Sequence, residues 1–335
     1  MPHRFRWAAP VVVTVLALAL SACGGGSSAT EVAAGSDGRV PLRVTSLGGA
    51  LCEELGLFAK DGAFFDKNGI DVKFVGATGG NAGVAALQSG AADVVFITSA
   101  AALNAMAKGV DLTIVSGAVR TGPETNGVIV KAGSGIRGPR DLAGKKVGVL
   151  ELSGMSTTTV KLWVDEATGG ASGIKFVQLP FSELVPAVLN GTVDAAHVTA
   201  AEIYGLTKNR TGRSIGSPVY DVPGGSTPTG MYVAKSDFAA KNQGTMEKFV
   251  AAMQQAADAA NDPKNTKRFD VMAGYCKKPA ADLAQIPQPG RPTFEGYIDR
   301  DSFARIVKTV HEAQMIPSGF DPEKKVAAFA WATKN

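Results

Sequence analysis

Short apolar runs alternate with amphipathic stretches along most of the chain. Within residues 75–117, a Gly-rich turn leads into a helical stretch, an apolar run at 94–97, a second helical stretch and a further strand. A continuous apolar run is typical of a parallel strand that is covered on both faces. This βαβαβ order predicts an open, mostly parallel sheet flanked by helices, with Asn81 and Ser99 as the helix caps.

Part of this pattern recurs further along the chain. Residues 86–93 and 187–194 both end a helical stretch on a small polar residue and Gly, and both enter a strand through Asp. Thr98 and Thr199 follow at the carboxyl ends of the two strands, which is where open α/β sheets bind ligands. We therefore expect two similar domains with a ligand cleft between them; the alternative is a coincidence between two helix–Gly–strand joints.

The order of the elements also predicts the domain boundaries. Strands and helices alternate again from residue 145, and the apolar spacing beyond Asp237 is helical, including the stretch 326–330. We expect the first domain to be discontinuous and to include the C-terminal helices. The prediction is residues 39–124 with 234–335 for domain 1 and residues 125–233 for domain 2.

The N-terminal stretch has the pattern of a targeting segment. In residues 1–22, basic residues precede an apolar run that is too short to span a membrane as a helix. The sequence LSAC, ending at Cys23, resembles the bacterial lipobox, in which the Cys carries the lipid. We expect an extracytoplasmic protein anchored through Cys23 to the outer face of the cell membrane, with residues 23–38 as a flexible tether. The alternative is an ordinary signal peptide with an incidental Cys.

Charge and motifs exclude several classes of function. The formal net charge is only +4, and the chain has no basic run, so we expect no nucleic-acid partner. Residues 133–138 match G-x-G-x-x-G by letter, but Pro139 follows where a dinucleotide-binding loop would open a helix. Outside the targeting segment His197 and His311 are the two histidines, with no further metal ligand at a suitable spacing. We expect no catalytic residues, metal or cofactor, and therefore no enzyme.

Four stretches together resemble a known family. The segments ALQSGAADVV, AMAKGVDLTIVSG, RDLAGKKVGV and VLNGTVDAAHVT occur in this order. They are similar to the extracytoplasmic substrate-binding proteins of ABC importers, in the branch that includes alkanesulfonate-, taurine-, nitrate- and thiamine-pyrimidine-binding proteins. The resemblance implies a type II-like, two-domain periplasmic-binding-protein fold and a monomer that delivers a small molecule to ABC permease subunits. An enzyme or a signalling receptor on the same fold is the alternative of another class.

The resemblance also implies a disulfide. In this family the C-terminal helical part packs back on the first domain, which would bring Cys276 close to Cys52. Disulfides persist in an extracytoplasmic compartment. We therefore expect a bridge between them; the alternative is two buried small apolar residues.

The loops at the strand ends offer backbone N–H groups and hydroxyls with almost no fixed negative charge. Such loops at helix N-termini are suited to anions, so we expect a small organic anion, a sulfonate or carboxylate. Plain helix capping is the alternative for each loop. A buried Glu202 would instead favour a thiamine-type pyrimidine or another nitrogenous ligand, and Arg120 and His197 are left open between the cleft and a structural role. The expected ligand-binding residues are Leu47, Gly48, Gly49, Thr78, Gly80, Asn81, Thr98, Ser99, Ser153, Ser156, Thr157, Thr199 and Glu202.

Overall fold

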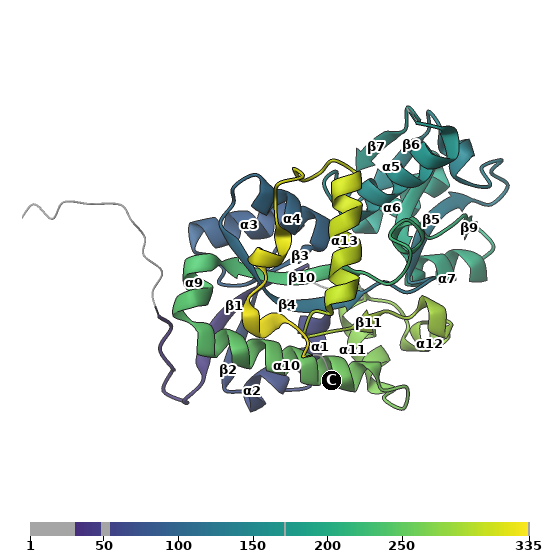
Figure 1. Ribbon diagram of the computed structural model, residues 1–335. Coiled ribbons are helices and arrows are strands. Elements are labelled where there is room, and N and C mark those ends of the chain that lie inside the picture. Colours follow the sequence, from purple (N-terminus) through teal and green to yellow (C-terminus); the bar gives the residue numbers. More distant parts are fainter. Residues whose placement is uncertain (1–30, 48–53, 171, 334–335) are drawn as a thin grey trace, which may run out of the picture.

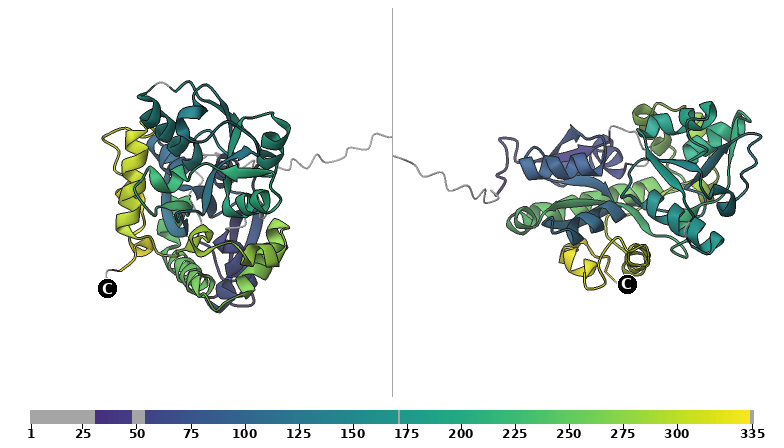
Figure 2. Two further views of the ribbon diagram at one scale, coloured as in Figure 1. Left: turned by 90° about the vertical axis from the view of Figure 1, so that its right-hand side faces the viewer. Right: turned by 90° about the horizontal axis from the view of Figure 1, so that it is seen from above.

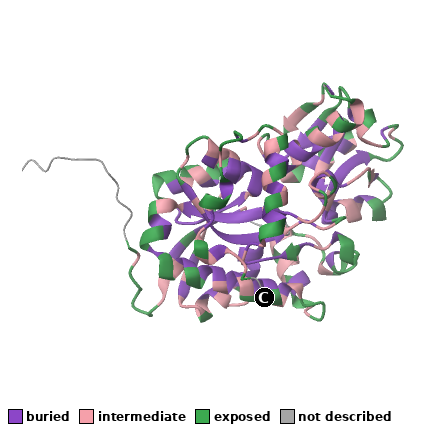
Figure 3. Cartoon of the chain, in the orientation of Figure 1, coloured by how far each residue is buried: buried purple, intermediate pink, exposed green. Residues whose placement is uncertain are grey.

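The chain folds into two lobes in the computed structural model, which describes residues 31–47, 54–170 and 172–333 (Figure 1). Lobe 1 is the part built on strands β1–β4, β10 and β11, and lobe 2 is the part built on strands β5–β9. Helices cover the sheets of both lobes, and most buried residues lie along the strands and the inner faces of these helices (Figure 3). The predicted two-domain α/β fold class is therefore confirmed.

The sheet of lobe 1 is mixed. β1 and β2 pair in parallel, and a parallel bridge from Val44 to Val94 joins β1 to the start of β3. β10 lies between β3 and β4 and runs antiparallel to both, so β3 and β4 are parallel to each other but not adjacent. The strands are β1 (Val40–Ser46), β2 (Ile70–Gly76), β3 (Val95–Thr98), β4 (Leu112–Arg120), β10 (Pro228–Lys235) and β11 (Thr293–Phe294).

Helices pack on both faces of this sheet. On one face, Phe65 and Phe249 stack with ring centroids 5.4 Å apart in a large apolar cluster. On the other, Leu103 and Phe303 belong to a second cluster, and α13 lies at the periphery of the molecule (Figure 2). The helices are α1 (Leu55–Asp61), α2 (Phe64–Lys67), α3 (Gly80–Ser89), α4 (Ser99–Ala107), α9 (Ser236–Lys241), α10 (Gln243–Asn261), α11 (Lys267–Cys276), α12 (Ala280–Ala284) and α13 (Arg300–Glu312).

Lobe 2 has a single five-stranded sheet in the order β7-β6-β8-β5-β9. The parallel pairs are β6–β7 and β6–β8, whereas β5, the strand that enters from lobe 1, is antiparallel to its neighbours. Separate apolar clusters lie around Val160 and around Leu184. The elements are β5 (Asn126–Lys131), β6 (Lys146–Val149), α5 (Met155–Thr168), β7 (Lys175–Gln178), α6 (Phe181–Asn190), β8 (Ala195–Thr199), α7 (Ala200–Lys208), β9 (Gly212–Ser214) and α8 (Pro218–Asp221).

The recurring sequence pattern corresponds to equivalent joints in the two lobes. The glycine that ends each helix has a positive φ, 74° in α3 and 80° in α6, which glycine adopts without steric cost. The N–H of Asp93 donates to Arg43 O at 2.8 Å, and the N–H of Asp194 donates to Lys146 O at 2.9 Å. Each Asp carboxylate also accepts from the N–H of the same partner at 2.8 Å. The Asp therefore fixes β3 beside β1 in lobe 1 and β8 beside β6 in lobe 2.

The two connections between the lobes lie side by side. Thr121 N donates to Thr227 O at 3.0 Å, and Arg120 is paired with Pro228. Residues 228–233, which the sequence prediction placed in the second domain, lie in β10 and hence in the sheet of lobe 1. The return connection therefore precedes Pro228.

The C-terminal part is helical up to Glu312, apart from the short strand β11, but not beyond it. Residues 326–330, predicted as a helix, form an extended residue and a 3₁₀ turn instead. β11 covers only the end of β4, which leaves the carbonyl of Ile114 at a free sheet edge. Ala327 N donates to this carbonyl at 2.9 Å, and Val326 bridges to Ile114. Sheet-edge hydrogen bonding thus outweighs the helical spacing of the apolar residues.

Candidate ligand-binding site

A cavity of about 100 Å³ lies between the two lobes, near the carboxyl ends of β3, β6 and β8. Both lobes contribute to it, and its wall combines apolar side chains with hydroxyl, amide and imidazole groups. Among the described residues that line the cavity, Glu151 carries the one charged side chain. The lining residues are Phe96, Thr98, Val119, Asn126, Leu150, Glu151, Gly154, Met155, Ser156, Phe181, His197, Thr199, Val219 and Thr229.

The carboxylate of Glu151 connects the two lobes across this cavity. Glu151 follows β6 in lobe 2 and is 5% exposed. Its Oε1 accepts a hydrogen bond from Gly80 N at 2.6 Å, and its Oε2 accepts one from Thr98 Oγ1 at 3.0 Å. Both donors belong to lobe 1: Gly80 is the first residue of α3, and Thr98 ends β3. The N-terminus of α3 thus binds a carboxylate, as its free N–H groups and dipole favour.

Gly80 must lack a side chain for this contact to form. A Cβ at this position would lie 2.6 Å from Ile97 Cγ1 and 3.1 Å from Glu151 Oε1. The group that approaches the backbone at Gly80 is a protein carboxylate, and the role of the Gly-rich loop in ligand binding stays a prediction.

The joint between β6 and α5 forms the lobe 2 side of the cavity. Gly154 precedes the helix, and the N–H groups of its first turn have no acceptor within the helix. Ser156 lines the cavity, whereas the Thr157 hydroxyl donates to the carbonyl of Glu151 at 2.7 Å and so stabilises the loop. Met155 is buried in the apolar cluster of lobe 1 that contains Ala100. Lobe 2 thus contacts lobe 1 through both an apolar and a charged side chain from one joint.

Thr98 and Thr199, the residues singled out by the repeat, both line the cavity. Each precedes a helix, and each hydroxyl is bonded to a glutamate. Thr98 donates across the lobes to Glu151, and Thr199 donates to Glu202 Oε2 in its own lobe at 2.6 Å. The two hydroxyls occupy equivalent positions, but they contact different partners.

His197 also lines the cavity, on the strand that ends at Thr199. Its Nε2 lies 3.3 Å from Asn126 Oδ1. Burial lowers the pKa of His197 to about 4, so the imidazole is neutral at pH 7 and supplies one donor and one acceptor. The imidazole is therefore a polar part of the cavity wall and not a cation.

Glu202 does not line this cavity. Its Oε1 lies 2.9 Å from Lys278 Nζ, and the pair borders a separate groove of about 540 Å³ that also contains Leu47. Lys278 belongs to the connection between α11 and α12, which reaches from lobe 1 to α7 of lobe 2. Glu202 therefore has a cation from the chain itself as its partner.

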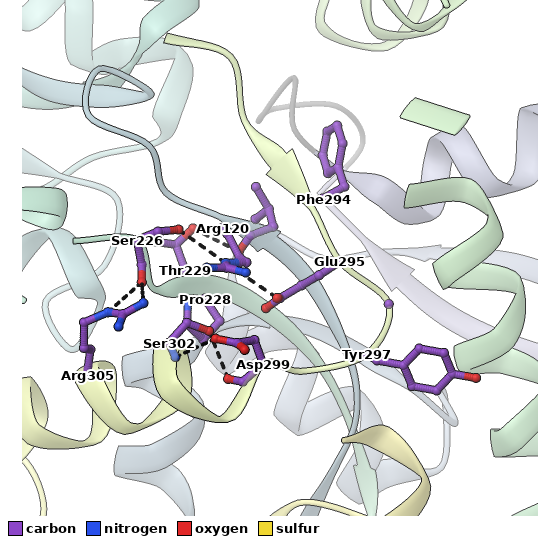
Figure 4. A network of polar contacts seen from close by, with 12 residues as sticks. Arg120, Ser226, Pro228, Thr229, Phe294, Glu295, Tyr297, Asp299, Ser302 and Arg305 are labelled. Atoms are coloured by element: carbon purple, nitrogen blue, oxygen red, sulfur yellow. Dashed lines mark hydrogen bonds and ion pairs between the residues drawn. The ribbon is translucent and has the colours of Figure 1, made fainter. Parts of the chain in front are cut away.

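Arg120 is the last residue of β4, directly before the connection between the lobes, and is absent from the described lining of the cavity. Its Nε is 3.3 Å from Ser226 Oγ and 3.6 Å from Glu295 Oε2 (Figure 4). Arg305 of α13 donates to the carbonyl of the same Ser226 at 2.8 Å. Of the two roles left open for Arg120, the geometry supports the structural one, at the lobe 1 end of the paired connections.

The remaining described residues predicted to bind the ligand are not among those that line the cavity. Thr78 and Asn81 are exposed, and Asn81 lies within α3 instead of capping it, because Gly79 is the N-cap. Ser99 is buried and donates to Pro228 O at 2.7 Å; it follows the N-cap residue Thr98 and does not itself cap α4. Ser153 is partly exposed and lies beside the cavity-lining loop. Gly48 and Gly49 are outside the described residues.

The cysteine predictions fall partly on undescribed residues. Cys276, at the end of α11, is disulfide-bonded. Cys52 and Cys23 are outside the described residues, so the pairing of Cys276 with Cys52 and the lipid attachment at Cys23 stay predictions.

Glu151 is the main residue of the cavity wall that sequence reasoning missed. A signal was present, because Glu151 directly follows Leu150 at the end of a predicted strand, the same position from which Thr98 and Thr199 were chosen. The expectation of loops with almost no negative charge did not consider it.

No cluster of three or more His, Cys, Asp or Glu side chains suited to a metal ion occurs among the described residues. In the same part of the chain, no helix is long and apolar enough to cross a membrane.

The sequence matches a known family, and the fold is similar to that of several solved structures. Residues 56–266 match the model of a family described as NMT1/THI5 like. The alkanesulfonate-binding protein SsuA from Xanthomonas axonopodis pv. citri, solved with MOPS bound, superposes with a TM-score of 0.72 at 17% identity, covering 86% of this chain and 98% of that chain. The periplasmic nitrate-binding protein NrtA from Synechocystis PCC 6803 gives 0.68 at 13% identity, covering 89% and 87%.

A third similar structure is the periplasmic aliphatic sulphonate-binding protein SsuA from Escherichia coli. Its TM-score is 0.67 at 20% identity, covering 85% of this chain and 96% of that chain. No curated protein matches the sequence. At these identities, the structural likeness establishes the fold of the chain.

Proposed function

Because the chain belongs to the NMT1/THI5-like family, we propose that it is the extracytoplasmic solute-binding component of an ABC importer. It captures a small organic solute between its lobes and presents the closed lobes to the permease subunits, without turnover of the solute. The similar sulfonate- and nitrate-binding proteins support this proposal at the level of fold. Rotation of the lobes about the paired connections at Thr121 and Thr227 is the hinge motion that opens and closes such a cleft.

The ligand that the site favours is a small organic anion, a sulfonate or carboxylate. One observation carries this proposal: Gly80 N and Thr98 Oγ1 already bind a carboxylate, that of Glu151. Ser156 and the N-terminus of α5 face the cavity from the opposite lobe. Hydrogen bonds from N–H groups to a charged acceptor contribute about 1.5–3 kcal/mol each, so a few of them are enough for tight capture.

A nitrogenous ligand is the second candidate, and a specific contact favours it. Each oxygen of Glu151 accepts one hydrogen bond from the chain and has capacity for a further donor. A protonated amine or pyrimidine in the cavity would use that capacity. Glu202, which the sequence suggested for this role, is instead paired with Lys278.

We further propose an oligomeric state, a permease contact and a membrane attachment for the protein. The mature chain is a monomer, it contacts the permease through both lobes, and it is held at the outer face of the membrane by a lipid on Cys23. The last part rests on the sequence alone.

A thermal-shift screen against sulfonates, carboxylates, nitrate and pyrimidines tests the function. A ligand at a hundred times its Kd stabilises the fold by about 2.7 kcal/mol, which is readily detected. Ser156→Leu should abolish the shift by filling the cavity, whereas Ser89→Leu, at an exposed end of α3, should preserve it. If no solute shifts the melting temperature, or if both variants respond like the wild type, the proposal is wrong.

A further inference from the structure

We propose that Glu151 is an internal competitor for the anion-binding groups of lobe 1, so that an anionic ligand binds only by displacing its carboxylate. This inference rests on the proposed function and specifies how the same cavity selects its ligand. The Glu151 bridge, meaning the hydrogen bonds from Gly80 N and Thr98 Oγ1 to the Glu151 carboxylate, joins the lobes at the cavity wall. The bridge therefore affects two properties, lobe closure and anion affinity.

Glu151 and an anionic ligand need the same hydrogen-bond donors. A ligand sulfonate or carboxylate in this cavity would be held by the same kind of donors that hold Glu151, and those donors are limited in number. A second anion beside Glu151 would also be repelled, since no lysine or arginine is among the described lining residues. Displacement relieves both conflicts, because it frees the donors and removes the like charge.

The Glu151 side chain can move without its loop. The loop that carries Glu151 is fixed through its main chain: Thr157 Oγ1 donates to Glu151 O at 2.7 Å, and Gly154 N donates to the same oxygen at 3.2 Å. The side chain can therefore rotate away from α3 while the loop keeps its shape. Met155, four residues on, packs in the apolar cluster of lobe 1 and makes no contact through the Glu151 carboxylate, so this apolar contact does not hinder the rotation.

The consequence for specificity follows from competition. If the bridge is formed ten times as often as it is open, the apparent affinity for an anion falls about tenfold. An anion that binds only the donors of lobe 1 is then excluded. An anion that also binds Ser156 and the N-terminus of α5 displaces the carboxylate. Glu151 thus sets a threshold of affinity for anions.

Lobe closure of the purified mature protein tests the bridge without knowledge of the natural ligand. Small-angle scattering should show a larger radius of gyration for Glu151→Ala than for the wild type. Acetate in excess should restore the wild-type radius of gyration in this variant, because it accepts hydrogen bonds from the donors that Glu151 no longer occupies. It should leave the wild type unchanged. Glu166→Gln, an exposed glutamate on α5, is the matched control and should scatter like the wild type.

Anion affinity is the second measurement. Glu151→Gln keeps one acceptor but removes the charge, so calorimetry with ethanesulfonate and propanoate should show binding at least tenfold tighter than in the wild type. Equal scattering of the wild type and Glu151→Ala, with no response to acetate, would overturn the competitor role and leave the import function standing. Loss of binding of a protonated amine in Glu151→Gln, without tighter anion binding, would also overturn it and assign Glu151 to ligand recognition.

Discussion

Glu295, which follows β11 and lies beside Arg120, should make the stability of the fold fall as pH rises. The carboxyl is buried, and among the described residues its Oε1 has no hydrogen-bond partner. Burial raises the pKa of Glu295 from 4.5 to about 8; Arg120 opposes this rise, and Asp299 adds to it. Between these two pH values the folded protein retains a proton that the unfolded chain has released.

The sign and size of the effect follow from this difference. Because the folded state binds more protons in this window, the free energy of unfolding decreases with increasing pH. The decrease is about 1.4 kcal/mol per pH unit, or about 5 kcal/mol in all between pH 4.5 and about 8. Glu295→Gln retains the shape of the protonated side chain but has no proton to lose. Its stability relative to the wild type should therefore rise across the same range.

Urea unfolding at pH 5, 6, 7, 8 and 9 measures this difference directly. The wild-type and Glu295→Gln curves should diverge up to about pH 8 and then run parallel. Glu166→Gln, which replaces an exposed glutamate, should follow the wild type throughout. Parallel curves for Glu295→Gln and the wild type between pH 5 and 8 would show that the carboxyl is ionised in the folded protein, and would refute this prediction.

Three further predictions concern the anchor, the disulfide and the Gly-rich loop. Cys23→Ser should release the protein from the membrane fraction or leave its precursor unprocessed; unchanged fractionation without lipid labelling would exclude the anchor. A bridge between Cys52 and Cys276 predicts no alkylatable thiol on either residue in the unreduced native protein by mass spectrometry. Gly80→Ala should weaken ligand binding at least tenfold without loss of the circular dichroism signal, because its Cβ would lie 2.6 Å from Ile97 Cγ1; unchanged affinity would remove this loop from the site.

Much of the fold was predictable because its signals are local. Apolar runs, helix-ending glycines and the repeated Asp at the strand entry identify the strands of both lobes and place Thr98 and Thr199 at the cavity. The position of β10 was not predictable in this way, because it pairs with strands more than a hundred residues earlier in the chain. Its insertion between β3 and β4 changes the expected parallel sheet into a mixed one.

The difference between local signals and long-range contacts also explains the errors at the site. Asn81 and Ser99 have the composition of helix caps, but the backbone begins each helix one or two residues earlier. The partner of Glu151 lies 71 residues away in the other lobe, and no local pattern reports a contact that forms only when two domains meet. Side-chain direction at a domain interface depends on tertiary packing, whereas the identity of a strand end does not.

Thr98 and Thr199, the equivalent threonines of the two lobes, each bond to a glutamate that takes part in a contact between the lobes. Thr98 donates to Glu151 across the lobes, and Thr199 donates to Glu202, whose other oxygen meets Lys278 of the α11–α12 connection. Lys278 is 31% exposed, so water partly replaces its contact with Glu202 when the lobes separate. Glu151 is buried, and a ligand anion cannot replace it as an acceptor without taking its donors. Under the proposed competition, the Glu151 bridge is therefore the one of these two contacts that ligand binding disrupts, and the Glu202–Lys278 pair can persist while it does so.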